Sequence, residues 1–301
     1  MSAPENVAAK ADVARPDGAR EPAARAGAEW RIAGVLGPRS PLGARLRALD
    51  WSRMTMGSLG VACVIAIWWF AAFIIADNVI LPSPVATGRT LWHFLDRPYP
   101  ARGDTLLGDT AISLVRILIG FAWGALVGTV LGAMMAAVRP LRLVVDPLIE
   151  LARPLPPLAF IPLLIVWFGI GELPKIVLIG LGVIPIMVVS VVAALDAVPE
   201  EYVEAARSLG ASPQYALLHV RVRAALPGVI TGLRLAMGIS WTSIVAVEMI
   251  AATSGLGYVI LEASNYLVTT LIFSGIVLIA VVALILDGLL RVVRRIVAPM
   301  G

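Results

Sequence analysis

Long apolar segments with few or no charged residues limit most strongly how this chain can fold. A helix needs about 20 apolar residues to cross the roughly 30 Å hydrocarbon core of a bilayer. Five charge-free segments come close to or exceed that length: 54–76, 117–138, 155–171, 176–195 and 267–286. The third is expected to begin earlier, near Leu143, and a sixth segment, 228–252, is long enough although it contains two charged residues. The sequence therefore predicts an all-α membrane protein with six transmembrane helices.

The composition agrees with this class and excludes several others. Hydrophobic residues make up 59% of the chain and charged residues 15%, whereas soluble domains have about 45–50% and 25%. So few charged groups cannot solvate the surface of a soluble enzyme or keep a chain disordered. A single cysteine, Cys63, excludes a fold held together by disulfides.

The lysines and arginines indicate the orientation. Nine of the 24 precede residue 54, and a cytoplasmic N-terminus places 17 of them in cytoplasmic segments and only four on the opposite side. By the positive-inside rule, both termini are expected in the cytoplasm. The predicted parts are a cytoplasmic tail and juxtamembrane segment at 1–53, a transmembrane domain at 54–295 and a cytoplasmic C-terminus at 296–301.

The N-terminal tail has its own composition. Residues 1–40 are rich in Ala, Pro, Gly and Arg without periodicity, as is typical of a solvated tail. No apolar core of a signal peptide lies there. Leu42, Leu46 and Leu49 share a helical face beside arginines, and two interpretations stay open: an interfacial amphipathic helix or a plain linker.

Small residues mark one face of the second predicted span. Gly120, Gly124, Gly128 and Gly132 recur every four residues and leave a stripe without side chains. In lipid, such stripes let helix backbones approach closely. The stripe predicts helix packing within the chain, with a homodimer or sliding interface as the alternative.

Prolines mark the third predicted span. Pro154, Pro156, Pro157 and Pro162 each remove a backbone donor, so this helix should be kinked. Irregular backbone at membrane depth is tolerated only where protein or water covers it, and the kink should therefore not face lipid. Pro185 predicts a milder irregularity in the fourth span.

Five ionisable residues lie in or near the spans: Arg116, Glu150, Arg153, Arg234 and Glu248. Charges at such depth are costly and mark functional candidates, here for a translocation pathway or for intramembrane ion pairs. Their depth predicts an outer pair of Arg116 with Glu248, and an inner cluster of Glu150 with Arg153 or Arg234. Purely structural pairing or snorkelling remains an open alternative.

The loop between the fourth and fifth spans, 196–227, is too long for a turn. Pro199 suits the start of a helix, Gly210 suits its end, and Ser212 and Pro213 suit the start of a second short helix. Both ends are tethered to spans, which argues against a DNA-binding helix pair. A docking surface for a cytoplasmic protein accounts better for the small and charged residues, which are Glu204, Ala205, Ala206, Arg207 and Gly210.

The same residues resemble a known motif. Glu204-Ala205-Ala206, followed after three residues by Gly210, is similar to the EAA motif of the integral-membrane permeases of bacterial ABC importers. Val220 fits the aliphatic position of that pattern and Leu226-Pro227 fits a later proline. Val222-Arg223 departs from the usual Leu-Pro, which leaves the path after the second helix open.

The resemblance extends from about residue 81 to 295. The blocks LPSP at 81–84, SLVRILIGF at 113–121 and DPLIELARPLPPLAFIPLLIVWFGIGE at 146–172 are similar to the nitrate, sulfonate and taurine branch of these permeases. TGLRLAMGISW at 231–241 and AVEMIAATSGLGY at 246–258 add to the similarity. The block at 146–172 is most similar to taurine permeases.

This resemblance implies the type I ABC importer permease fold, with a coupling helix in the cytoplasmic loop. It implies a non-catalytic, multi-pass subunit of the bacterial inner membrane that pairs with a second copy. Two copies of a separate ATPase, which bind ATP and Mg, would dock on the loops, and a periplasmic or surface binding protein would deliver the solute. The expected solute is a small anion, taurine or another sulfonate, with nitrate, bicarbonate or another small organic solute as the alternative. Arg116, Arg153 or Arg234 would offer a guanidinium to it.

Other classes of function find less support. Lys10 and Lys175 are the only lysines, and neither follows glycine or precedes Ser or Thr, so the chain has no phosphate-binding loop of its own. No catalytic, metal or cofactor site and no nucleic-acid partner is expected. An ion-coupled secondary transporter is the alternative of a different class, although no inverted repeat is visible and the long loop would stay unexplained.

Overall fold

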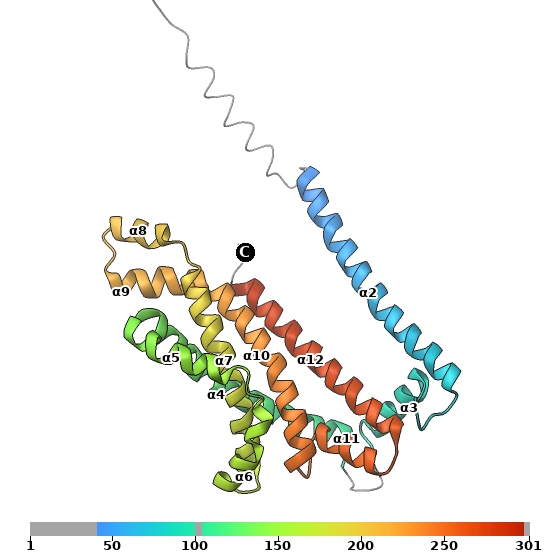
Figure 1. Ribbon diagram of the computed structural model, residues 1–301. Helices are drawn as coiled ribbons and strands as arrows, with labels where there is room; N and C mark the ends of the chain where they lie inside the picture. The colour runs from blue at the N-terminus through green and yellow to red at the C-terminus, as the bar shows by residue number, and fades with distance from the viewer. Residues whose placement is uncertain (1–40, 100–103, 298–301) are drawn as a thin grey trace, which may run out of the picture. The chain divides into compact units, whose positions relative to one another are not determined.

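The computed structural model describes residues 41–99 and 104–297, with side chains for 56–99 and 104–296 (Figure 1). The chain divides into two units, residues 1–67 and 68–301. Helix α2 runs from Pro41 to Ile75 and contains the first predicted span up to Ile75. Of the first unit, the structure describes residues 41–67, which form the N-terminal part of this helix. The predicted tail at 1–40, the residues after 297 and the side chains of the Leu42 face lie outside the described part.

The second unit is helical throughout its described residues. Its long helices are α4 (Leu106–Ala137), α7 (Glu172–Asp196), α10 (Val222–Ala251) and α12 (Thr269–Val297). Its shorter ones are α3 (Pro84–Phe94), α5 (Arg139–Ala152), η1 (Pro157–Phe160), α6 (Ile161–Phe168), α8 (Glu200–Ser208), α9 (Pro213–Tyr215), the π-helical turn η2 (Ala216–Arg221) and α11 (Leu256–Asn265).

The number of spans agrees with the prediction. Five described helices are long and apolar enough to cross a membrane, and the pair α5 and α6 gives a sixth if it counts as one span. The all-α fold is therefore confirmed for the described residues. Three helices extend well beyond the predicted apolar segments: α2 begins thirteen residues before Met54, α4 begins eleven residues before Ile117 and α12 ends eleven residues after Leu286. In each case the added turns carry polar or charged residues.

Helix α7 is the centre of the core. Leu178, Ile179, Val183 and Met187 are completely buried on it, between α4 and α10. The glycine stripe explains how closely α4 approaches. A methyl group on Gly128 would lie 2.6 Å from Met187 Cβ, and each of the other three glycines would meet α7 equally closely. The stripe therefore packs within the chain, as predicted, through van der Waals contact between backbones.

The third predicted span is not one kinked helix. Helix α5 ends at Ala152, three prolines within four residues follow, and α6 runs in a direction 92° from α5. Each proline lacks the amide that the helix ladder needs, and the chain crosses this break as extended backbone and a 3-10 turn. The predicted disturbance by the prolines is confirmed, but it is a break between two helices and not a kink within one, and Arg153 lies in this break. Pro185, by contrast, leaves α7 continuous.

Two short helices were not predicted from the sequence. Helix α3 begins at Pro84 after Ser83, whose Oγ accepts a hydrogen bond from Ala86 N at 3.2 Å, a capping arrangement readable from Ser-Pro. Helix α11 follows Gly255, whose φ of +106° favours glycine.

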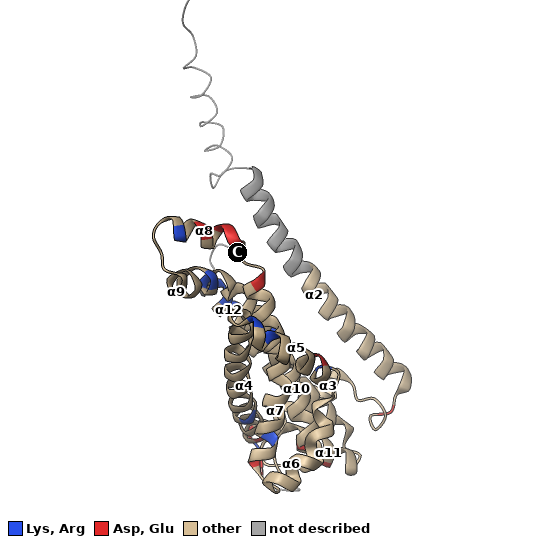
Figure 2. Ribbon diagram, turned by 60° about the vertical axis from the view of Figure 1, so that its left-hand side comes forward, with Lys and Arg blue, Asp and Glu red and all other residues tan. Residues whose placement is uncertain are grey.

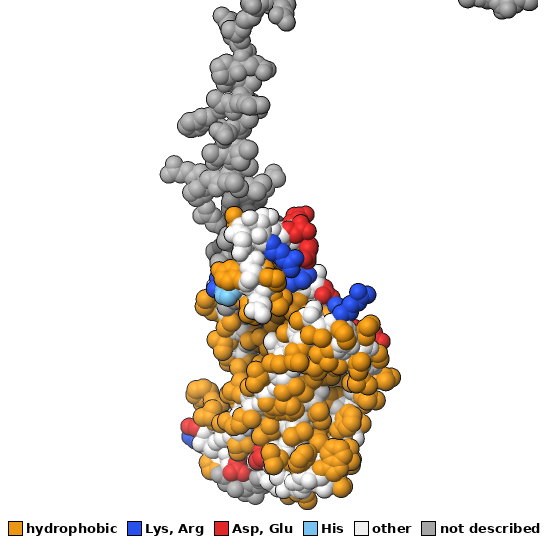
Figure 3. Space-filling view, turned by 90° about the vertical axis from the view of Figure 1, so that its left-hand side faces the viewer, with side chains coloured by type: hydrophobic (Ala, Val, Ile, Leu, Met, Phe, Trp, Pro, Cys, Tyr) orange, Lys and Arg blue, Asp and Glu red, His pale blue; other side chains and the backbone are white. Residues whose placement is uncertain are grey.

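Charged side chains of the second unit gather mainly at two ends. Figure 2 shows Lys, Arg, Asp and Glu around α8 and α9 at one end, and near α6 at the other. On the face in Figure 3, apolar side chains cover the surface between these ends. Exposed apolar residues of the second unit include Val166, 80% exposed, and Leu126, 66% exposed. Such a surface fits a hydrocarbon environment.

Candidate functional site

The loop between α7 and α10 forms a helical projection at one end of the bundle (Figure 1). Helix α8 begins after Pro199 and ends at a turn where Gly210 has a φ of +87°. The amides of Gly210 and Ala211 donate to Arg207 O and Ala206 O, at 2.9 and 3.1 Å, and so satisfy the end of α8. Ser212 Oγ accepts from Tyr215 N at 3.2 Å and caps α9, as predicted.

The projection leaves its motif residues accessible. Glu204, Ala205, Arg207 and Gly210 are exposed and Ala206 is half-buried. Leu209 is 90% exposed, more than any other large hydrophobic residue whose side chain the structure describes. The opposite face of α8 is anchored by buried Val203 and by Arg221, which reaches Glu200 at 3.2 Å. The result is a helix held on one face and carrying an accessible apolar and charged surface on the other.

The second helix of the loop differs from the prediction. It is not a separate short helix, because α9, η2 and α10 follow one another without a break from Pro213 to Ala251. The π-helical turn Ala216–Arg221 accommodates the join. Val222-Arg223 stand where the motif has Leu-Pro, and without that proline the chain simply continues as helix.

A buried polar network surrounds Arg116 on α4, at the other end of the bundle. Its guanidinium donates to Glu248 Oε1 at 2.8 Å and to both carboxylate oxygens of Glu172, at 2.5 and 2.8 Å. The two remaining N–H groups donate to the carbonyl and hydroxyl oxygens of Ser254, at 2.7 and 2.9 Å. The predicted Arg116–Glu248 pair is confirmed, and it leaves Arg116 no free donor for a solute.

Glu248 is completely buried and is held from several elements. It accepts hydrogen bonds from Ser113 Oγ and from Gly257 N, at 2.8 and 3.0 Å. Asp109, one turn before Ser113, accepts from Gly255 N at 2.6 Å. The network thus ties α4, α7 and α10 to the turn before α11.

Sequence reasoning missed several members of this network. Glu172 and Lys175, 2.9 Å apart, were not assigned because they lie at a predicted boundary between spans. Their spacing of three residues on one helix, beside an intramembrane arginine, was a usable signal. Ser113 and Asp109 gave none, because single polar residues at a helix start are ordinary.

The predicted inner cluster is wrong. Arg234 binds Asp287 on α12 through two hydrogen bonds, of 2.7 and 3.2 Å, and not Glu150. Asp287 also accepts from Arg291 one turn later, at 2.8 Å. Glu150 and Arg153 are exposed, and neither forms an ion pair with a described residue. The prediction failed because the sixth span was treated as free of charge, although Asp287 lies one residue beyond its predicted end.

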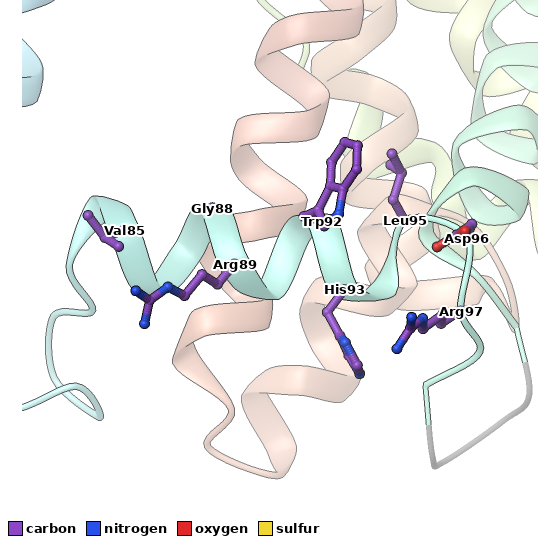
Figure 4. A pocket seen from close by; sticks show the side chains of 8 residues that line it. All are labelled: Val85, Gly88, Arg89, Trp92, His93, Leu95, Asp96 and Arg97. Carbon is purple, nitrogen blue, oxygen red and sulfur yellow. The ribbon is translucent and has the colours of Figure 1, made fainter.

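Two cavities adjoin the break between α5 and η1. They measure about 430 and 350 Å³, and Arg153, Ile186 and Ile239 line both. A third cavity of about 630 Å³ lies along α3, and its lining includes Arg89, Trp92, His93 and Arg97 (Figure 4). In that view Trp92 projects to one side of α3 and His93 to the other.

Comparison with known proteins agrees with this architecture. A family model described as "Binding-protein-dependent transport system inner membrane component" matches residues 124–299. The taurine transport system permease protein TauC of Escherichia coli (strain K12) is 37% identical over 259 residues, which are 84% of this chain and 94% of that protein. The putative aliphatic sulfonates transport permease protein SsuC of Bacillus subtilis (strain 168) is 32% identical, covering 79% of this chain and 85% of that protein.

More distant relatives extend the picture. The nitrate import permease protein NrtB of Synechocystis sp. is 28% identical, over 80% of this chain and 88% of that protein. An inward-facing structure of the MetNI methionine ABC transporter matches with a TM-score of 0.54 and 22% identity, over 62% of this chain and 93% of that chain. That likeness shows the fold, which is the type I ABC importer permease fold. The chain belongs to the family of binding-protein-dependent transport system inner membrane components, the membrane subunits of ABC importers.

Proposed function

We propose that this chain is the permease subunit of an ATP-driven importer for a small anionic solute, with taurine or another sulfonate as the expected solute. The observation that carries this proposal is the 37% identity to a taurine permease over 84% of the chain. A sulfonate relative at 32% identity supports the same solute class. Nitrate is the second candidate, because a nitrate permease is 28% identical over a similar length.

The loop projection is the proposed docking site for a separate cytoplasmic ATPase. Exposed Leu209 would enter an apolar pocket of that protein, while Glu204 and Arg207 would form charged hydrogen bonds at its rim. Buried Val203 and the ion pair of Glu200 with Arg221 support this role, because they connect α8 to the helix that continues into α10. ATP and Mg would be bound by the partner, and this chain would contribute no catalytic or cofactor-binding residue.

The remaining parts of the proposal concern assembly and orientation. A second copy of the chain would complete the pathway, and a binding protein would deliver the solute on the side opposite α8. The loop and both termini would lie in the cytoplasm of a bacterial cell, which the excess of arginines in these segments supports.

Reconstitution tests the proposal. Proteoliposomes holding this chain and its ATPase, with the binding protein added on the outer side, should accumulate radiolabelled taurine only when ATP is supplied. Unlabelled nitrate and unlabelled alkanesulfonates, added as competitors, distinguish the two candidate solutes. Uptake by the chain alone, driven by an ion gradient, would instead establish an ion-coupled secondary transporter.

A binding assay tests the docking site separately. Leu209→Asp should reduce co-purification of the ATPase by at least about tenfold, because a charge would enter an apolar contact. Gln214→Asp, an exposed position on neighbouring α9, is the matched control and should retain the ATPase. Equal retention by both variants would place the docking site elsewhere.

A further inference from the structure

Arg153 differs from the other cations of the bundle. Arg116 and Lys175 are bound by Glu172, and Arg234 is bound by Asp287. Arg153 is exposed and forms no ion pair with any residue that the structure describes. Of the three arginines that the sequence offered for contact with a solute, it is therefore the one whose guanidinium is free.

Arg153 also lies at mid-height in the bundle. The larger of its cavities is lined by Leu181, Gly182, Ile184, Pro185 and Ile186, near the middle of α7, and the smaller also by Val189 and Ser190. At 1.5 Å per residue, Pro185 is about 16–20 Å from either end of that helix. A snorkelling arginine reaches an interface only from near a helix end. Arg153 is thus a charge at depth, of the kind that marks a functional position.

The wall that bears Arg153 is unsuited to lipid. The prolines of the break interrupt the backbone ladder, and irregular backbone at this depth requires cover by protein or water. One proline of the break, Pro157, packs closely against α7, because a methyl group on Gly182 would lie 3.1 Å from both Pro157 Cγ and Ile239 Cγ2. The two cavities of about 430 and 350 Å³ lie beside this proline-rich wall and share Arg153.

We propose that Arg153 contacts the oxyanion group of the solute as it passes the break between α5 and η1. This inference rests on the proposed function and assigns a specificity-determining residue to it. The guanidinium would bind two sulfonate oxygens side by side. Apolar residues shared by the cavities, Ile186 and Ile239, would contact the carbon chain. The exposure of Arg153 keeps the interaction weak enough for the solute to leave.

Thiol labelling tests this without knowledge of the natural solute. In a Cys63→Ser background, Ile239→Cys is placed in both cavities and Tyr266→Cys, in an exposed turn, serves as the reference. The assembled transporter is treated with sulfonatoethyl methanethiosulfonate, an anion, or with its trimethylammonium counterpart, a cation. The ratio of the anionic to the cationic rate should be about three- to tenfold higher at Ile239→Cys than at Tyr266→Cys.

Substitution of the arginine completes the test. Arg153→Gln should remove that preference, Arg153→Lys should keep much of it, and Arg294→Gln, which removes an exposed cation from the end of α12, should leave it unchanged. The proposal is overturned if neither reagent reaches Ile239→Cys, or if the preference survives Arg153→Gln. The comparison with Tyr266→Cys needs no change at Arg153, so a variant that fails to assemble does not block the test.

Transport supplies the second readout. Arg153→Gln should raise the half-saturating concentration of taurine or lower its uptake about ten- to a hundredfold, with co-purification of the ATPase unchanged. Labelling that depends on Arg153, in a transporter that does not carry taurine, would reject the proposed solute and retain this inference. ATP-driven taurine uptake that Arg153→Gln leaves unchanged would reject this inference alone.

Discussion

Arg116 Nη1 lies 2.8 Å from Glu248 Oε1, where Arg116 is 3% exposed and Glu248 is completely buried. The pair joins α4 to α10 across 132 residues of sequence. Neither charge can be solvated by water, so each depends on the other and on Ser113, Glu172 and Ser254. The network therefore fixes the packing of α4 against α7 and α10 at this end of the bundle.

Glu248→Gln should therefore destabilise the bundle strongly. Breaking a buried pair costs about 3–5 kcal/mol, and because Glu172 still balances Arg116 in this variant, we expect a loss at the lower end of that range. The variant should show a lower midpoint of unfolding in detergent, measured by circular dichroism against temperature. Arg116→Gln should have a comparable effect.

Glu150→Gln is the control for this prediction. Glu150 is exposed and has no ion-pair partner among the described residues, so the midpoint should stay within experimental error of the wild type. Equal midpoints for Glu248→Gln and Glu150→Gln would mean that the Arg116 network contributes nothing to stability.

The sequence allowed part of this network to be predicted. Arg116 and Glu248 could be paired because Arg116 borders the segment 117–138, Glu248 lies within 228–252, and both are near the outer ends of their spans. Glu172 and Ser254 could not be added, because their contacts depend on the turns after α6 and α10. The predicted inner cluster of Glu150 with Arg153 or Arg234 was wrong for a related reason. Arg234 had several possible partners, and only the packing of α12 on α10 selects Asp287.

The glycine stripe gives a second prediction. A methyl group on Gly128 would lie 2.6 Å from Met187 Cβ and 2.9 Å from Ile184 O, so that α4 and α7 must separate. Gly128→Ala should cost about 1–3 kcal/mol of unfolding free energy, as overpacking does. Gly288→Ala is the matched control, because nothing lies within 4 Å of that position on α12. It should be neutral or slightly stabilising, since alanine favours helix. The same detergent melts decide between these outcomes.

Helix existence was easier to predict than helix continuity. The apolar lengths predicted the long helices, since only a helix satisfies its backbone within lipid. The apolar segments did not predict the 92° angle between α5 and α6. The positions of the prolines show that a helix is interrupted, but they do not determine the angle between its two parts. In the loop the error is the reverse, because a break was predicted where the helix is continuous. Gly210 ends α8 as predicted, but the helix that begins at Pro213 continues into α10.

The Arg234–Asp287 pair predicts a smaller effect than the Arg116 network. Both side chains are 27% exposed, so water screens the charges in part. Asp287→Asn should lower the unfolding free energy by about 1–2 kcal/mol, because the charge-assisted hydrogen bonds that it accepts from Arg234 and Arg291 become weaker. Thermal melts of Asp287→Asn and Glu248→Gln, measured side by side, check this order. A larger loss for Asp287→Asn would contradict the ranking by burial.

The proposed orientation predicts which side of the membrane each end of the bundle faces. Leu209, on the loop projection, and Tyr266, in the turn between α11 and α12, are 90% and 69% exposed. In a Cys63→Ser background, a membrane-impermeant maleimide should label Tyr266→Cys in intact spheroplasts and Leu209→Cys only in inverted vesicles. The reason is that arginines gather in the segments next to α8, and such segments stay in the cytoplasm. Labelling of both positions from the same side would contradict an odd number of crossings between them, and reversed labelling would invert the proposed topology. Because the ATPase is cytoplasmic, reversed labelling would also remove the loop from its reach.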